Sequence, residues 1–132
     1  TTDINPEAVK HLKKQRLKSI KSNLFSNIKK IKKNKFDLII FNPPYLPLDK
    51  REPKDSRTNT TAGKKGYEII IKFLTQAKNY LNENGRILLL FSSLSQPKII
   101  FGHVKGLDFD IRLLNKENLF FEELFVFELS SK

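Results

Sequence analysis

The residues of this chain that are best suited to chemistry form one tetrapeptide, Asn42-Pro43-Pro44-Tyr45. The carboxamide oxygen of Asn42 and the carbonyl oxygen of Pro43 are two acceptors, which can hold both hydrogens of an NH2 group. The lone pair of that nitrogen can then point at an electrophile, and the Tyr45 ring can stack on the flat group that carries the nitrogen. The tetrapeptide therefore predicts a site that orients a planar nitrogen nucleophile.

A predicted strand over residues 36–41 positions this tetrapeptide. The run is short, rich in Ile and Phe and bounded by prolines, which is typical of a parallel-sheet strand buried on both faces. Pro43 and Pro44 have no N–H to donate to a sheet, so the strand must end there in a stiff turn. Ligands bind at the carboxyl ends of strands in open α/β sheets, so we expect Asn42 and Tyr45 to lie at such an edge.

The rest of the chain alternates predicted helices and strands. Helices are expected where apolar residues recur at helical spacing and Asn, Pro or Gly residues mark the ends. Three segments meet this criterion: residues 6–14, the segment from Gly66 to Gly85, and the segment that starts at residues 95–97 and ends at residue 106. Strands are expected over residues 17–21, 86–91, 109–114 and 124–129. Ser92 and Ser93 follow the second of these strands, and we expect them to line the site in a minor role.

The composition limits the kinds of protein that this chain can be. Its 132 residues suffice for one domain with a real core, and the lack of Cys excludes a disulfide framework and a thiolate zinc site. No apolar stretch approaches the length that spans a membrane, and the first residues lack the layout of a signal peptide. We therefore expect a cytoplasmic protein without a membrane partner. His11 and His103 have no ligand-like neighbours, so no metal site is predicted.

The formal net charge of +11 is strongly positive. It would suit a polyanionic partner such as RNA, so a nucleic-acid partner stays open. Lys, Asn, Ile and Phe are abundant together, however, as in a biased codon pool, and many of the lysines lie between Lys10 and Lys35. We therefore favour a solvated basic face over a dedicated nucleic-acid groove.

The tetrapeptide after a buried strand resembles the signature of class I methyltransferases that use S-adenosylmethionine (SAM) and modify amide or exocyclic amine nitrogens. With its flanks, the sequence resembles the HemK/PrmC-type protein glutamine methyltransferases, above all their archaeal and eukaryotic branch. The resemblance spans essentially the whole chain. The flanking segments that carry it are Thr2-Asp3-Ile4-Asn5-Pro6-Glu7-Ala8-Val9, Ser22-Asn23-Leu24-Phe25, Thr61-Ala62-Gly63-Lys64-Lys65-Gly66, Gly85-Arg86-Ile87-Leu88-Leu89 with Ser92-Ser93, and Phe121-Glu122-Glu123-Leu124.

The resemblance implies an α/β fold with a class I (Rossmann-like) methyltransferase sheet, mostly parallel with an antiparallel carboxyl-terminal strand. Residues 1–132 would form a single partial methyltransferase domain that lacks the first βα unit, because the glycine-rich G-x-G loop of the family does not occur in this sequence. The long polar segment 46–65 would line the substrate entrance. The isolated chain is accordingly expected to bind SAM weakly.

The resemblance also implies which residues contact the cofactor. Asp3 would accept hydrogen bonds from both ribose hydroxyls of SAM, and Ile4 would lie against the adenine. Asn23 and Leu24 occupy the adenine-contacting turn, where the family normally has Asp in place of Asn23. Asn42 would contribute to both the cofactor and the substrate site. From the residues alone, Asp3 can equally support the start of the following helix, and Asn23 can be an ordinary turn residue.

The implied reaction is direct displacement of the SAM methyl group by the side-chain amide nitrogen of a protein glutamine, with a translation release factor as the substrate. Asn42 and Pro43 would carry catalysis, and Pro44 and Tyr45 would complete the substrate site. Relatives of this branch pair with a small zinc-binding activator subunit. Two alternatives remain: methylation of an adenine amine in RNA or DNA, and a non-catalytic remnant or one half of a split methyltransferase.

Overall fold

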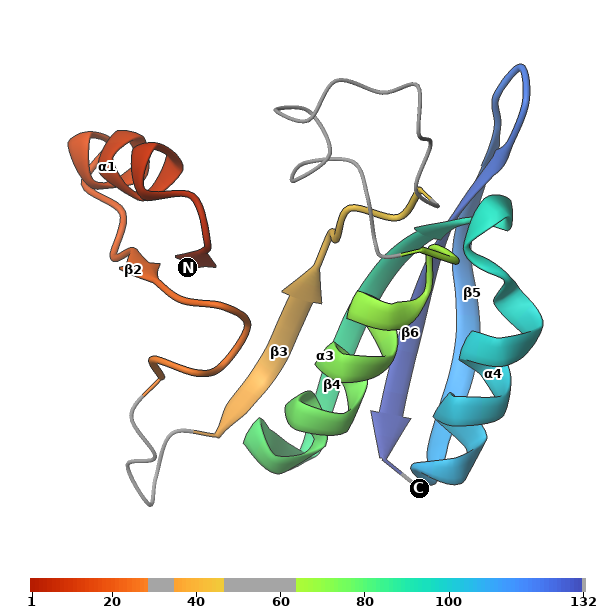
Figure 1. Cartoon of the computed structure of the whole chain (residues 1–132). Helices are drawn as coiled ribbons and strands as arrows, with labels where there is room; N and C mark the ends of the chain where they lie inside the picture. The colour runs from red at the N-terminus through yellow and green to blue at the C-terminus, as the bar shows by residue number, and fades with distance from the viewer. Residues whose placement is uncertain (29–34, 47–63, 132) are drawn as a thin grey trace. The chain divides into compact units, whose positions relative to one another are not determined.

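The computed structural model describes residues 1–28, 35–46 and 64–131. The chain divides into two compact units, Thr1–Asn34 and Lys35–Lys132 (Figure 1). The expectation of one partial domain over residues 1–132 stays a prediction. Within the part of the chain that the structure describes, no helix is long and apolar enough to cross a membrane.

The first unit is a small arrangement of two strands and one helix. Strands β1 (Thr2–Asp3) and β2 (Ile20–Lys21) pair in parallel, and helix α1 (Pro6–Lys14) lies between them in the chain. The strand expected over residues 17–21 is therefore shorter than predicted. The Leu17 N–H donates a hydrogen bond of 3.1 Å to the Leu12 carbonyl oxygen of α1. This bond keeps Leu17 in the turn that follows the helix, outside the strand pair.

The start of α1 is the one that its sequence predicts. The Asn5 side-chain oxygen accepts a hydrogen bond from the Glu7 N–H at 2.9 Å, which satisfies a backbone donor that the first turn leaves free. Pro6 occupies the first helical position, where a missing N–H is harmless. Val9 is buried on the inner side of the helix. These features fix where the chain leaves β1 and therefore where Asp3 lies.

The second unit is a four-stranded mixed sheet with two helices. Its elements in chain order are β3 (Phe36–Phe41), α3 (Glu68–Ala77), the 3₁₀ turn η1 (Lys78–Tyr80), β4 (Leu81–Ser92), the 3₁₀ turn η2 (Ser93–Ser95), α4 (Pro97–Gly106), β5 (Phe109–Asn118) and β6 (Glu123–Ser131). The strand order is β3-β4-β6-β5. β3 and β4 are parallel, and β6 is antiparallel to both of its neighbours. The predicted closing pair of strands is confirmed, and both strands are longer than expected.

Helices α3 and α4 cover one face of this sheet (Figure 1). Phe41 of β3 stacks on Phe73 of α3 with the ring centroids 3.9 Å apart, and Phe91 of β4 meets Phe101 of α4 edge to face. The buried apolar side chains of the unit include Ile70, Leu74, Ala77, Ile87, Leu89, Ile100, Val104, Phe109 and Leu129. This core fixes β3 and β4 side by side and so sets the edge at which both strands end.

The apolar sequence of β3 predicted a strand buried on both faces, and this prediction is wrong. It is the edge strand of the four-stranded sheet, and α3 and α4 lie on the same face of that sheet. Because side chains alternate along a strand, Leu38 and Ile40 point to the face opposite Phe41, and Ile40 is 68% exposed. The apolar run correctly indicates a strand, but it cannot say what covers each face.

The helix expected between residues 66 and 85 is shorter than predicted. It ends at Ala77, and Leu81 opens β4 instead of continuing the helix. Leu81 is buried as expected, but it is a strand residue. Asn82 donates a hydrogen bond of 2.6 Å to the Asp37 carboxylate, which ties this segment to β3. Asn and Gly are also poor helix formers, so the helical periodicity was misleading beyond Ala77.

Two other elements agree with the sequence. The helix expected to begin at residues 95–97 and end at 106 is confirmed as α4, with Pro97 at its first position. The strand expected over residues 86–91 is confirmed within β4. These two elements matter for the site, because the short segment that joins them lies beside the end of β3.

The close approach at Gly85 generates a prediction about stability. A Cβ at this position would lie 2.7 Å from Leu81 Cγ and 2.8 Å from the Phe36 carbonyl oxygen. Gly85→Ala should therefore lower the free energy of unfolding by about 1–3 kcal/mol, because strand backbone must shift. Gly102→Ala is the matched control, since nothing lies within 4 Å of its Cβ position in α4. This control should raise stability by about 0.5–1 kcal/mol. Urea unfolding measures both, and equal changes in the same direction would contradict the structure.

Candidate active site

Asn42 is the first residue after β3, and its side chain is exposed. In the described ranges, its carboxamide has no hydrogen-bond partner. The following Pro43 is buried and so fixes the chain at the point where the strand ends. An amide that no internal partner occupies can accept and donate hydrogen bonds to a ligand. The predicted acceptor therefore lies at the carboxyl end of a strand, as its sequence position indicated.

The end of the tetrapeptide is anchored by a buried serine. Ser95 is fully buried, and its hydroxyl donates a hydrogen bond of 2.6 Å to the Tyr45 carbonyl oxygen. Tyr45 itself is half-buried. The segment is therefore held at both ends, by β3 before Asn42 and by Ser95 after Pro44, and this constraint reduces the freedom of the Asn42 backbone.

Two more serines near Ser95, Ser92 and Ser93, form hydrogen bonds at the end of β4. Ser92 is fully buried, and its hydroxyl donates to a carboxylate oxygen of Glu122 while it accepts from the Leu94 N–H at 3.1 Å. The Ser93 hydroxyl accepts from the Glu123 N–H at 3.0 Å. These bonds connect the end of β4 with the start of β6. Together with Ser95, they form one network that we call the serine turn, Ser92–Ser95.

The minor lining role expected for Ser92 is wrong, whereas the one expected for the half-buried Ser93 stays a prediction. Ser92 is buried and hydrogen-bonded, so it supports the site from beneath instead of lining it. The contributions of Ser95 and Glu122 were not predicted. Three serines within four residues after a buried strand were the available signal, because serines at strand ends commonly bond nearby backbone groups.

In the first unit, the predicted cofactor residues lie at one edge. Asp3 ends β1 and is opposite Lys21 of the parallel strand β2, so Asn23 follows at the same end of the pair. One carboxylate oxygen of Asp3 accepts a hydrogen bond of 2.8 Å from the Asn5 N–H. This contact shows that Asp3 does support the start of α1. Its second carboxylate oxygen has no hydrogen bond in the described part of the chain.

The turn after β2 is shaped by Ser22. Its hydroxyl donates to the Leu24 carbonyl oxygen at 2.8 Å and accepts from the Asn27 N–H at 3.0 Å. Leu24 has a φ of 53°, a left-handed conformation that is uncommon outside Gly and Asn. The Asn23 side chain is exposed beside it. The turn thus presents an exposed amide on a backbone whose shape is fixed from inside.

The predicted site residues are distributed over both units. Asp3, Ile4, Asn23 and Leu24 belong to the first, and the tetrapeptide 42–45 belongs to the second. Of the predicted substrate loop 46–65, residues 47–63 lie outside the described residues. Within the described ranges, no group of His, Asp or Glu side chains could hold a metal ion.

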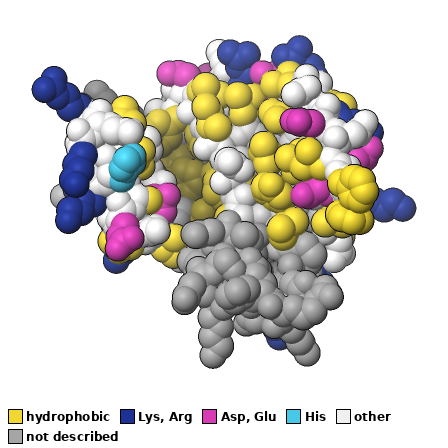
Figure 2. Space-filling view, turned by 90° about the horizontal axis from the view of Figure 1, so that it is seen from above, with side chains coloured by type: hydrophobic (Ala, Val, Ile, Leu, Met, Phe, Trp, Pro, Cys, Tyr) yellow, Lys and Arg dark blue, Asp and Glu magenta, His cyan; other side chains and the backbone are white. Residues whose placement is uncertain are grey.

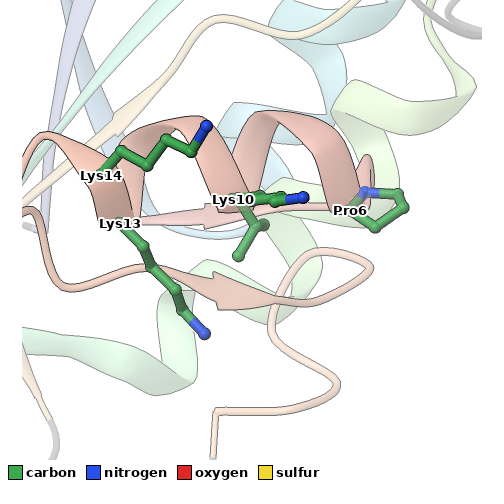
Figure 3. Close-up of a pocket in the computed structure, with 5 residues that line it drawn as sticks. Pro6, Lys10, Lys13 and Lys14 are labelled. Atoms are coloured by element: carbon green, nitrogen blue, oxygen red, sulfur yellow. The ribbon is translucent and has the colours of Figure 1, made fainter.

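A pocket on the first unit is formed by Pro6, Val9, Lys10, Lys13 and Lys14 of α1 (Figure 3). It contains none of the predicted site residues. The side chains of Lys13 and Lys14 point to different sides of the helix (Figure 3). The lysines therefore do not converge on one point, as an anion site would require.

Known proteins similar to this chain are methyltransferases. A protein of Methanocaldococcus jannaschii, provisionally named a protein N5-glutamine methyltransferase, is 38% identical over 94% of this chain and 65% of its own length. A release factor glutamine methyltransferase of Aquifex aeolicus is 34% identical over 67% of this chain and 35% of its own length. The chain thus spans less than two thirds of these relatives. They confirm the resemblance to HemK/PrmC-type glutamine methyltransferases.

A solved structure and a family model complete the comparison. The structure is the Mtq2-Trm112 complex of E. cuniculi, described as responsible for methylation of the translation termination factor eRF1. It matches 99% of this chain and 70% of its own with a TM-score of 0.72 and 23% identity. This likeness confirms the predicted class I methyltransferase fold. The family model described as Eco57I restriction-modification methylase matches residues 1–119. The chain therefore belongs to this methylase family.

Proposed function

We propose that this chain is part of an enzyme that transfers a methyl group from SAM to the side-chain amide nitrogen of a protein glutamine in a translation release factor. The observation that carries the proposal is the exposed Asn42 carboxamide, which has no internal partner among the described residues and is held at the end of β3. The glutamine methyltransferases among the relatives support the choice of an amide nitrogen as acceptor.

The chemistry of this reaction suits a site that works by orientation. An amide nitrogen is a poor nucleophile, and the tetrapeptide Asn42-Pro43-Pro44-Tyr45 itself contains no strong base. SAM, when bound, supplies a methyl group on a sulfonium leaving group. Asn42 and the Pro43 carbonyl oxygen would accept both amide hydrogens and so hold the nitrogen lone pair in line. Tyr45, with Pro44, would form the apolar wall against which the planar amide lies.

The residues present also fit the cofactor. The Asp3 carboxylate uses only one oxygen for the Asn5 N–H, so the other can accept a ribose hydroxyl. The exposed Asn23 amide offers an acceptor for an adenine amine without the negative charge that the family pattern has there. We infer that the first unit, including Ile4 and Leu24, contacts the adenosine and that the second unit orients the acceptor amide.

A second candidate is methylation of an adenine amine in nucleic acid. The family model that matches is described as a restriction-modification methylase, and the net charge of +11 would suit a polyanion. An adenine amine offers the same pair of hydrogens as a glutamine amide, so the tetrapeptide alone does not distinguish the two substrates.

A small activator subunit is a further proposed partner, since the solved Mtq2 structure contains Trm112.

Replacement of Asn42 tests its role in the reaction. In the full-length natural protein, Asn42→Ala should slow single-turnover methyl transfer about a hundredfold, because removing one oriented acceptor costs on the order of 3 kcal/mol in the barrier. SAM affinity should change far less. Asn84→Ala, an exposed asparagine in β4, is the matched control and should leave the rate unchanged. A change below threefold for Asn42→Ala would refute the role.

A conservative change at Asp3 separates its two roles. Asp3→Asn keeps an oxygen for the Asn5 N–H but removes the charge and one acceptor, so SAM should bind about tenfold more weakly while stability stays nearly constant. Asp3→Ala should lower both the affinity for SAM and the stability of the protein. Calorimetric titration of the full-length protein with SAM measures the first effect, and urea unfolding measures the second. Unchanged SAM affinity in both variants would refute the proposed contact of Asp3 with SAM, and Asp3 would then only support the start of α1.

The choice of substrate is tested by labelled methyl transfer. The full-length natural protein is incubated with labelled SAM and a release factor that carries the Gly-Gly-Gln motif, beside its Gln→Ala version and beside bulk RNA. Label should appear only on the unchanged release factor. Label in RNA would replace the glutamine assignment with the adenine alternative, and label that persists on the Gln→Ala factor would show that this glutamine is not the acceptor.

A further inference from the structure

The connection between β5 and β6 presents two adjacent phenylalanines to solvent. Phe120 is 93% exposed and Phe121 84% exposed, with their rings edge to face at a centroid distance of 4.7 Å. A hydrogen bond of 2.8 Å from the Leu119 N–H to the Glu122 carbonyl oxygen closes the turn beneath them. We call Leu119–Phe121 the aromatic tip. It projects from the sheet end at which the β5–β6 hairpin closes (Figure 1).

Hydrogen bonds tie the aromatic tip to the site. The Glu122 carboxylate, directly after the tip, accepts from the buried Ser92 hydroxyl, and the Glu123 N–H donates to Ser93. In the same serine turn, Ser95 donates to the Tyr45 carbonyl oxygen. Three serines of one short turn thus anchor both the tip and the tetrapeptide, so the tip stands at the same end of the sheet as the proposed acceptor site.

Exposure of this size requires an explanation. Exposed apolar side chains that occur singly are normal, but two neighbouring phenylalanines with a partly exposed leucine form a contiguous apolar surface. Aromatic side chains are enriched at the centres of protein–protein interfaces, where they contribute much of the affinity. A turn that is closed by a hydrogen bond loses less conformational freedom on binding than an open loop does, so it is suited to contact a partner.

The charges around the tip indicate which partner it fits. Residues 116–123 contain three Glu and one Lys, although the whole chain carries a net charge of +11. The one lysine, Lys116, forms an ion pair with Glu123. Seen from above, hydrophobic side chains at this end of the molecule lie next to acidic ones (Figure 2). An acidic, apolar surface repels a phosphate backbone and suits an apolar segment with basic flanks.

We propose that the aromatic tip is a docking element for the protein that is methylated. It would contact an apolar, basically flanked surface of the release factor and so deliver the target glutamine to Asn42. This inference rests on the proposed function for its choice of occupant. It also explains why the serine turn bonds to both segments: the turn sets the distance between the docking surface and the acceptor site.

The test combines binding with kinetics in the full-length natural protein. The double variant Phe120→Ala/Phe121→Ala is compared with Leu113→Ala, which removes an exposed apolar side chain from the middle of β5. We expect the double variant to bind the release factor at least tenfold more weakly and to raise its KM equally, with kcat within twofold. Transfer to a short glutamine peptide and the KM for SAM should stay unchanged. Leu113→Ala should behave as wild type.

Each outcome separates the docking role from the proposed function. If the wild-type protein methylates glutamine but the double variant binds the release factor within twofold of wild type, the docking role is wrong and the function stands. If binding depends on the tip but no glutamine is methylated, the docking role stands and the function fails. Wild-type protein that does not bind the release factor, or a tip variant that loses affinity for RNA instead, would also overturn the docking role.

Discussion

The site depends on one constraint, which is that β3 cannot continue past Asn42. Two consecutive prolines remove the backbone donors that a strand needs, so the chain must leave the sheet at this residue. The chain does not then move freely, because the buried Ser95 hydroxyl holds the Tyr45 carbonyl oxygen at 2.6 Å. An amide whose position is set from both sides can orient a weak nucleophile without a strong base. Two of the similar proteins are named as glutamine methyltransferases, and a glutamine amide is such a weak nucleophile.

The structure assigns a support role to groups that do no chemistry themselves. Ser92 and Ser95 are fully buried, and their hydroxyls bond the tetrapeptide on one side and the β5–β6 hairpin on the other. Buried hydroxyls are costly unless they are hydrogen-bonded, so such a network is stable only in one arrangement. Ser92 and Ser95, with Ser93 between them, therefore connect the tetrapeptide of the proposed acceptor site with the aromatic tip.

Much of the fold and the place of the tetrapeptide could be predicted, because both follow from local rules. Asn5-Pro6 marks the start of α1, and Pro43-Pro44 marks the end of β3. Predictions that depend on distant contacts were less successful. β3 was expected to be buried on both faces, but coverage of a strand is decided by other elements. The helix end at Ala77 depends on pairing between Leu81 and Phe36, and the Ser92–Glu122 bond joins residues 30 positions apart. Neither contact leaves a periodic signal in the sequence.

The measurement that tests this account most directly is a crystal structure of the full-length natural protein with S-adenosylhomocysteine and a peptide that contains the target glutamine. We predict that the glutamine side-chain nitrogen lies within hydrogen-bond distance, about 2.7–3.2 Å, of both the Asn42 carboxamide oxygen and the Pro43 carbonyl oxygen. We also expect the Ser95 hydroxyl to keep its hydrogen bond to the Tyr45 carbonyl oxygen. A glutamine amide bound away from Asn42, or an Asn42 side chain turned away from the bound amide, would contradict the central claim.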